Sequence, residues 1–408
     1  MILDIINKKR VGEELSYTEI RDFFNGYLEG SVKDYQMSAL LMAICINGMT
    51  DEEVFALTKV FIDSGDVLDF KNYMGTKVDK HSTGGIGDKT TLIVGPIVSA
   101  CGVPVVKMSG RGLGYTGGTI DKLESIPGFR IDLDDEEVIK QVNDIGLVIT
   151  GQTNDLVPMD KVIYALRDVT GTVSSIPLIA SSIMSKKIAG GADKILIDIK
   201  VGKGALLNNK EDAKELSDLM IKIGKIYHKE VRTVISDMNV PLGKCIGNSL
   251  EVEEAISILQ CKEKDNNLYD LCIELASDMV SMGKDIPKSE AKKLVINALE
   301  SGDAFAKFSQ LVHKQKGNID KIDVCIHKKY IKAPKKGIVS DINALNLGKL
   351  SVSLGAGRKN KGDKIDYGVG IKINKNVGDS VKKGEILAYI YTDKSIKDIN
   401  VDELFTIK

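Results

Sequence analysis

The sequence predicts an α/β protein with three parts: a small helical domain, a large α/β domain with a mostly parallel sheet, and a C-terminal β-rich module. Three observations predict it. Helical periodicity dominates the first 65 or so residues and returns near residue 158. Strands alternate with helices between these segments and beyond them. After residue 328, short strands are separated by Gly, Asn and Asp.

The first helical segment carries two clear helix starts. Ser16 with Glu19, and Thr50 with Glu53, have the spacing of a capping box, in which each side chain bonds the other residue's main chain. Residues 158–190 have the same helical character. We therefore expect one helical domain built from residues 1–68 and 158–190 and interrupted by another domain.

The α/β domain is expected at residues 74–157 and 191–327. Four short runs rich in β-branched residues read as strands: "VPVVKMS", "LVITG", "KILIDIKVG" and "EVRTVISDMN". Helical segments such as "TTLIVGPIVSACG" and "DDEEVIKQVNDIG" stand between them. This alternation is typical of parallel strands joined by helices.

A third part is expected at residues 328–408, as a C-terminal α+β module. Its segment "VGDSVKKGEIL" resembles the hammerhead hairpins of biotinyl and lipoyl domains. Fold likeness alone does not carry function. A hammerhead-like module without a lipoyl attachment role is therefore expected.

Composition excludes several classes of protein. There are 56 Lys and Arg against 57 Asp and Glu, which gives a net charge of −1. Neither nucleic acid nor a membrane surface is expected as a partner, because both need a basic surface. The six cysteines lack C-x-x-C spacing, so we expect neither a zinc site nor a disulfide framework. A soluble, cytoplasmic protein is the resulting expectation.

Two glycine-rich stretches stand out, "DKHSTGGIGDK" at residues 79–89 and "KMSGRGLGYTGGTIDKLES" at residues 107–125. Glycine lets the backbone approach a ligand, and successive N–H groups make a concavity that binds anions. Both stretches add hydroxyls and cations, namely Ser82, Thr83, Thr90, Thr91, Ser109, Thr116, Thr119, Lys80, Lys107 and Arg111. They predict a phosphate site, with Thr119 at the start of a helix.

Two nucleotide-binding motifs have similar glycine-rich patterns. The Walker A pattern fails because Asp88, not glycine, precedes Lys89. The dinucleotide pattern G-x-G-x-x-G matches at Gly112, Gly114 and Gly117. However, the acidic residues that follow at 132–137 open a predicted helix instead of closing a second strand. A nicotinamide site is therefore not favoured.

A second group of polar residues lies elsewhere in the chain. His81 stands in the first glycine-rich stretch, where an acid–base group beside a bound anion is plausible. Ser182 and Lys186 are four residues apart and share one helix face, and Arg167 lies upstream. Each is compatible with a solvated surface. As a set they suit a planar polar group that gains negative charge.

Longer motifs carry a resemblance to a known family. "KHSTGGIGD", "KMSGRGLGYTGGTIDKLESIPGF", "ALRDVTGTV" and "SSIMSKKIAGGAD", in this order, resemble the pyrimidine-nucleoside phosphorylase and thymidine phosphorylase family. "VPLGKCIGNSLEVEEAI" and "SVSLGAGRKNKGDKIDYGVGI" extend the likeness over essentially the whole chain.

The resemblance implies an activity and a partner. Members of the family carry out reversible phosphorolysis, in which a pyrimidine nucleoside and phosphate give the free base and ribose or deoxyribose 1-phosphate. A homodimer is implied, with inorganic phosphate as co-substrate and no required cofactor. The family's phosphate site falls on Lys80, Ser82, Thr91, Lys107, Ser109 and Thr119. Its base site falls on His81, Arg167, Ser182 and Lys186, of which His81, Arg167 and Lys186 are the expected catalytic residues.

Lys107 resembles the broad-specificity members, which implies that both uridine and thymidine are substrates. The chain departs from the family elsewhere. Tyr115 stands where histidine is usual, and Lys89 stands where threonine is common. Some members bind potassium at positions that match Gly87, Lys89, Leu242, Cys245 and Glu254. A lysine ammonium at position 89 would replace that ion. The chain also ends somewhat short of typical members.

Three rival functions remain open at this point. An enzyme similar to anthranilate phosphoribosyltransferase would share the architecture and would need magnesium. A nucleoside-binding protein without activity would keep the same pocket. A nucleotide oxidoreductase would use the dinucleotide pattern.

Overall fold

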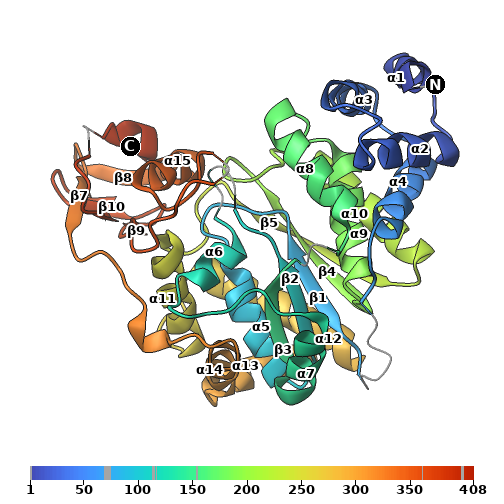
Figure 1. The fold of residues 1–408 in the computed structure, drawn as a ribbon. Helices are drawn as coiled ribbons and strands as arrows, with labels where there is room; N and C mark the ends of the chain where they lie inside the picture. The colour runs from blue at the N-terminus through green and yellow to red at the C-terminus, as the bar shows by residue number, and fades with distance from the viewer. Residues whose placement is uncertain are drawn as a thin grey trace. The chain divides into compact units, whose positions relative to one another are not determined.

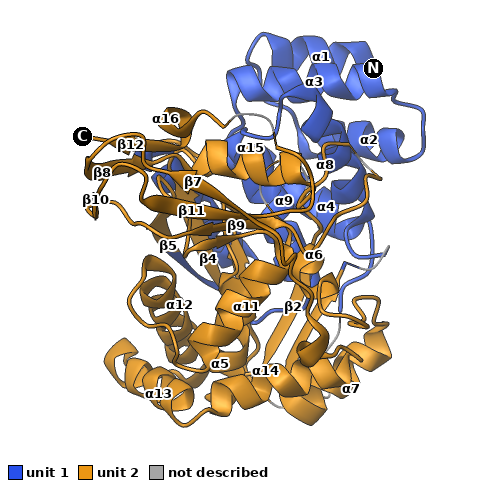
Figure 2. Ribbon diagram, turned by 90° about the vertical axis from the view of Figure 1, so that its left-hand side faces the viewer, with its two compact units in different colours: residues 1–73, 152–195, 209–233 blue, residues 74–151, 196–208, 234–408 orange. Residues whose placement is uncertain are grey.

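The computed structural model describes residues 2–68, 75–112, 115, 117–152, 155–360, 362–396 and 399–408. It divides into two compact units (Figure 2). Unit 1 comprises residues 1–73, 152–195 and 209–233, and unit 2 comprises residues 74–151, 196–208 and 234–408. Gly114 and Thr116, which the sequence analysis singled out, lie outside the described residues.

Unit 1 is helical. Its helices are α1 (Ile2–Arg10), α2 (Tyr17–Leu28), α3 (Asp34–Asn47), α4 (Asp51–Asp63), α8 (Pro158–Thr170), α9 (Ile176–Ala189) and α10 (Lys210–Ile226). Both expected capping boxes are present, at the starts of α2 and α4. The unit has wider bounds than the expected helical domain, and α10 groups with it, whereas the sequence pattern assigned this helix to the α/β domain.

One ion pair is buried among the N-terminal helices. The Lys9 ammonium donates to both Glu53 carboxylate oxygens at 2.8 Å, and the Leu15 N–H donates to Glu53 Oε1 at 2.8 Å. The side chains of Lys9 and Glu53 are 3% and 1% exposed. Glu53 also accepts from the Thr50 N–H in the capping box, so one carboxylate joins α1, the α1–α2 loop and α4.

The four predicted strands are present, and the predicted α/β class is confirmed. They are β2 (Val105–Ser109), β3 (Leu147–Gly151), β4 (Lys194–Val201) and β5 (Glu230–Asp237). A further strand, β1 (Val78–Ser82), was not predicted and leads into the first glycine-rich stretch. β2 and β3 pair in parallel, with Val105 opposite Leu147 and Ser109 opposite Gly151. β1, β4 and β5 follow one another in a second hydrogen-bonded group. The Val78 N–H donates to the carbonyl of Pro104, so β1 and β2 start side by side (Figure 1).

Apolar helices cover this sheet. The helices of unit 2 before the C-terminal module are α5 (Thr90–Ala100), α6 (Thr119–Glu124), α7 (Asp135–Ile145), α11 (Asn248–Leu259), α12 (Asn267–Lys284), α13 (Lys288–Glu300) and α14 (Asp303–Lys314). Helices α5 and α12 share one buried apolar cluster with the strands (Figure 1). The acidic run at 132–137 does open a helix, because Asp134 caps α7.

The C-terminal module is rich in short strands. After the short 3₁₀ helix η1 (Ile319–Lys321) it contains β7 (Lys328–Lys332), β8 (Gly337–Ile342), α15 (Ala344–Leu354), β9 (Gly370–Ile373), β10 (Ser380–Val381), β11 (Ile386–Tyr391), α16 (Val401–Leu404) and β12 (Phe405–Ile407). One sheet has the order β10-β8-β12, and the other has the order β6-β9-β11-β7. Strand β6 (Cys245–Ile246) comes from the preceding part of the chain, so the module's second sheet incorporates a strand from outside its own sequence.

The buried carboxylate gives a stability prediction. Glu53→Ala leaves the Lys9 ammonium buried without its partner, which is expected to cost about 3–5 kcal/mol. Thermal and denaturant unfolding of the full chain will measure the loss. Glu52→Ala, at the neighbouring exposed position, is the matched control and should change stability little. Equal stability of the two variants would contradict the prediction.

Candidate active site

The first glycine-rich loop links β1 to α5 and is held by Asp88. The Ser82 hydroxyl donates to Asp88 Oδ2 at 2.5 Å. The Thr90 hydroxyl and N–H donate to Asp88 Oδ1 at 2.6 and 3.1 Å. Burial opposes ionisation of Asp88, yet the charges of Lys200, Lys80 and Lys122 lower its pKa well below the ordinary value. The carboxylate therefore stays charged and fixes the loop.

Lys80, a predicted phosphate ligand, lies within a buried charge cluster. Its ammonium donates to the Thr90 hydroxyl and lies 3.6 Å from Asp198 Oδ2. Lys200 lies 2.6 Å from the same oxygen, and both Asp198 and Lys200 are fully buried. Asp198 also accepts from the Ser236 hydroxyl at 2.5 Å. These contacts hold the Lys80 side chain in place.

The second glycine-rich loop links β2 to α6. Lys107 and Ser109 are buried in β2, and Thr119 is the first residue of α6. Because β1 and β2 start together at one edge, Ser82 and Ser109 both end their strands at the opposite edge. Ligands of open α/β sheets bind at the carboxyl ends of the strands.

Lys122 ties the two loops together. Its ammonium donates to the carbonyls of Asp88 in the first loop, at 2.5 Å, and Gly117 in the second, at 3.3 Å. It also lies 3.0 Å from Glu251 Oε2 on α11, and its side chain is 1% exposed. A buried charge of this kind is tolerated only when its donors are used.

Lys89 fills the position of the suggested potassium site. Its ammonium donates to the carbonyls of Leu242 and Cys245 at 3.0 and 2.9 Å, and to Glu254 Oε2 at 2.5 Å. Burial opposes its charge, but Glu254 and Glu251 raise its pKa above the ordinary value. Gly87 has φ +76°, and a Cβ there would lie 2.6 Å from the Leu242 carbonyl oxygen. The ammonium of Lys89 thus lies among Leu242, Cys245 and Glu254, three of the five residues.

The second predicted set gathers in unit 1. Lys186 donates to Asp160 and, at 2.8 Å, to the Ser182 hydroxyl. Burial lowers the pKa of Lys186, and Asp160 partly offsets this. Arg167 is 1% exposed and donates to the carbonyls of Thr172, Leu178 and Val173 at 3.3, 3.2 and 2.8 Å. Three of its five N–H groups thus hold the turn between α8 and α9.

The remaining predicted residues are His81 and Thr91. His81 lies in β1 between Lys80 and Ser82 and is half-buried. Because side chains alternate along a strand, it points to the opposite face from its two neighbours. Thr91, the second residue of α5, is also half-buried. The structure thus brings together the loop residues in unit 2, and Arg167, Ser182 and Lys186 in unit 1.

Sequence reasoning missed several supporting residues. Asp160 lies seven positions before Arg167, which is two turns along α8, and this spacing was an available signal. Asp198 stands inside the apolar run of β4, where a charge is unusual unless paired. Asp88 was noted only because it breaks a motif. Its role in closing the loop is visible only in three dimensions.

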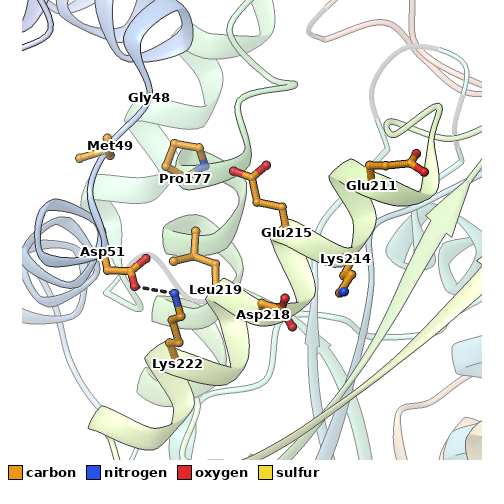
Figure 3. A pocket seen from close by; sticks show the side chains of 10 residues that line it. All are labelled: Gly48, Met49, Asp51, Pro177, Glu211, Lys214, Glu215, Asp218, Leu219 and Lys222. Atoms are coloured by element: carbon orange, nitrogen blue, oxygen red, sulfur yellow. Dashed lines mark hydrogen bonds and ion pairs between the residues drawn. The ribbon is translucent and has the colours of Figure 1, made fainter.

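A pocket in unit 1 involves other residues (Figure 3). It lies between the segment around Met49, Pro177 and one face of α10. Asp51 pairs with Lys222 at 2.6 Å, and Glu211, Glu215 and Asp218 also line it. Acidic side chains outnumber its lysines, so this pocket is unsuited to phosphate.

Comparison with known proteins gives the family. The helical bundle domain of the glycosyl transferase family matches residues 3–65, its a/b domain matches residues 74–305, and the pyrimidine nucleoside phosphorylase C-terminal domain matches residues 338–406. A pyrimidine-nucleoside phosphorylase of Staphylococcus haemolyticus is 48% identical over 99% of this chain and 94% of its own length. The chain belongs to the pyrimidine-nucleoside phosphorylase family.

Other relatives agree. A pyrimidine-nucleoside phosphorylase of Staphylococcus epidermidis is 48% identical over 100% of this chain and 96% of its own length. A solved structure of anthranilate phosphoribosyltransferase from Thermus thermophilus has a TM-score of 0.62 at 18% identity, and covers 77% of this chain and 100% of that one. At that identity the likeness concerns the fold alone. The family resemblance read from the sequence motifs is confirmed.

Proposed function

We propose that the protein catalyses the reversible phosphorolysis of uridine, thymidine and deoxyuridine in nucleoside salvage. The bond between C1′ of the sugar and N1 of the base breaks, and a phosphate oxygen bonds to C1′. The products are the free base and ribose or deoxyribose 1-phosphate. Identity of 48% over the full chain with pyrimidine-nucleoside phosphorylases is the observation that carries the proposal.

Phosphate is proposed to bind at the two glycine-rich loops. Its ligands are Lys80, Ser82, Thr91, Lys107, Ser109 and Thr119. The two hydroxyls that end β1 and β2, Ser82 and Ser109, support this site. Ser82 donates its proton to Asp88 in this structure, so the hydroxyl must turn from Asp88 before it can donate to phosphate.

The base is proposed to contact His81, Arg167, Ser182 and Lys186. When the C1′–N1 bond breaks, negative charge develops on the pyrimidine ring and its oxygens. The half-buried Lys186 ammonium and the Arg167 guanidinium stabilise that charge, and His81 donates to a base oxygen. Burial strengthens these interactions because the local dielectric is low. Asp160 orients Lys186 toward Ser182.

Lys107 is proposed to broaden the sugar specificity. It is buried in the middle of β2, two residues before Ser109. A cation beside the sugar tolerates a 2′-hydroxyl, so ribosides and deoxyribosides are both accepted.

We propose that the enzyme needs no added metal ion, because the Lys89 ammonium already supplies a positive charge at this position. Its three acceptors are those expected to bind potassium, and a second cation beside an ammonium would be repelled. The proposed enzyme therefore works without a bound potassium ion, and its co-substrate is inorganic phosphate.

A homodimer is proposed from exposed apolar side chains on unit 1. Tyr35, Met42 and Ile46 lie on one face of α3, and Tyr35 and Ile46 are 73% and 74% exposed. Leu3 on α1 and Val169 on α8 are also exposed, and both helices contact α3. Exposed apolar patches of this kind mark interaction sites. Light scattering of the purified chain tests the assembly.

Cytoplasmic location is proposed from the thiols. All six cysteines are free. Such thiols are kept reduced in the cytoplasm. Among the described residues, no helix is both long and apolar enough to cross a membrane. Cell fractionation tests this location.

An ultraviolet assay of base release tests the activity directly. Uridine and thymidine are both expected to be cleaved, and only when phosphate is present. Activity should survive chelation of divalent metals, whereas a phosphoribosyltransferase would lose it. Turnover of thymidine without uridine would contradict the specificity assigned to Lys107, and no turnover of either would overturn the proposed function.

Lys186 should control both rate and alkaline pH dependence. Lys186→Ala is expected to lower kcat about 10²- to 10³-fold, the effect of one donor at a developing anion. Because its pKa is lowered, wild-type Lys186 loses its proton, and the enzyme its activity, at a lower pH than an ordinary lysine would. Lys186→Arg keeps the charge and should move this alkaline limb to higher pH. Ionisation of the nucleoside itself affects both enzymes equally. Full activity of Lys186→Ala would disprove the role.

Lys89 gives a test of the tethered cation. Wild-type activity and unfolding temperature should be the same in potassium chloride and in tetramethylammonium chloride of equal ionic strength. Lys89→Thr leaves Glu254 buried without a cation and should lower the unfolding temperature, with partial recovery in potassium chloride only. A requirement of the wild type for potassium would contradict the assignment.

A further inference from the structure

The second glycine-rich loop has a closed neck. The Gly112 N–H donates to Asp121 Oδ2 at 2.7 Å. A Cβ on Gly118 would collide with the Gly112 nitrogen and the Arg111 backbone, so the two ends of the loop touch. Ser109 lies just before this neck and Thr119 directly after it. The relative position of these two hydroxyls therefore depends on the neck.

The C-terminal module supplies the residue that completes the neck. Arg358, which follows α15, donates through Nη1 to Asp121 Oδ1 at 2.8 Å and to the Gly112 carbonyl at 3.3 Å. The N–H of Gly112 is thus held by Asp121 and its carbonyl by Arg358. The Asp121 and Arg358 side chains are 2% and 13% exposed, so water and salt screen this pair little.

The module contacts the same region at two further points. The Tyr367 hydroxyl donates to Glu124 Oε2 on α6 at 3.4 Å, and Glu124 also accepts from Arg111. A Cβ on Gly348 in α15 would lie 3.0 Å from the Tyr115 carbonyl oxygen. The module itself is anchored beside α11, where Asn248 donates to the Ala356 carbonyl at 2.8 Å. Arg358 therefore extends from a fixed support.

Charge explains why an arginine is needed there. Asp121 is two residues from Thr119, and its carboxylate charge would repel an incoming phosphate. Arg111 Nη1 lies 3.7 Å from Asp121 Oδ1, but this side chain is half-exposed and pairs with Glu124, so it offsets the charge less than Arg358 does. Arg358 offsets the charge while leaving Asp121 able to hold Gly112. A guanidinium can serve both acceptors because its N–H groups are fixed in a plane.

We propose that Arg358 is a positioning residue for phosphate, acting through Asp121 and Gly112 to set Ser109 and Thr119. The inference rests on the proposed function in that these two hydroxyls are taken as phosphate ligands. The C-terminal module would thus contribute to phosphate binding without contacting the phosphate itself.

Steady-state kinetics of the full-length protein with uridine and phosphate test this. Arg358→Gln should raise KM for phosphate about 10- to 100-fold, the fold-change expected for one lost hydrogen bond between charged groups. KM for uridine should stay within about twofold of wild type, since the base residues lie on other elements. Arg358→Lys should give a smaller rise. Lys359→Gln, an exposed neighbour with the same loss of charge, is the matched control and should behave as wild type.

Asp121→Asn provides a second arm. It should also raise KM for phosphate, and combining it with Arg358→Gln should add little, because both act through one contact. If Arg358→Gln does not fold, Arg358→Lys takes its place. An unchanged KM for phosphate, or equal rises in both KM values, would overturn the inference.

Calorimetric titration with inorganic phosphate separates this inference from the proposed function. If the wild type binds phosphate without turnover, the proposed activity fails while weaker binding by Arg358→Gln still supports the positioning role. If the wild type binds no phosphate, or both proteins bind it equally, the positioning role is wrong.

Discussion

Two carboxylates one turn apart on α11 hold the two glycine-rich loops in place. Glu251 accepts the ammonium of Lys122 from the second loop, and Glu254 accepts that of Lys89 from the first. Each lysine also donates to carbonyls of other segments. Buried ion pairs are expensive unless the remaining donors are used, and here each ammonium also donates to main-chain carbonyls. Flexible glycine-rich loops thereby acquire fixed positions.

The other buried lysines near the loops are also paired with carboxylates. Lys80, Lys122 and Lys200 are matched by Asp88, Asp198 and Glu251, so the charges of these six residues balance. Hydroxyls then do much of the proposed binding. Hydroxyl donors bind an anion less tightly than several unpaired cations would. A phosphorylated product can therefore be released. This suits a reaction that runs in both directions.

Local signals made the fold largely predictable. Capping boxes, the β-branched runs and the acidic start of α7 correspond to real elements because each depends on neighbours within a few residues. The glycine-rich loops were also visible. Asp160 and Arg358 were not identified, because their partners are distant in sequence. Asp198 was not identified, because its contacts with Lys80 and Ser236 depend on tertiary packing. The grouping of α10 with unit 1 likewise depends on tertiary packing, which strand and helix patterns do not encode.

Strand β6 also limits how this chain can be shortened. It contributes the edge strand next to β9, and its residue Cys245 supplies a carbonyl to Lys89. Cutting the chain before residue 328 would expose that strand edge, and exposed edges promote aggregation. It would also loosen one wall around a buried ammonium. The C-terminal module follows the α/β part in sequence but shares a sheet with it. Removing the module by truncation is therefore not expected to leave a stable enzyme.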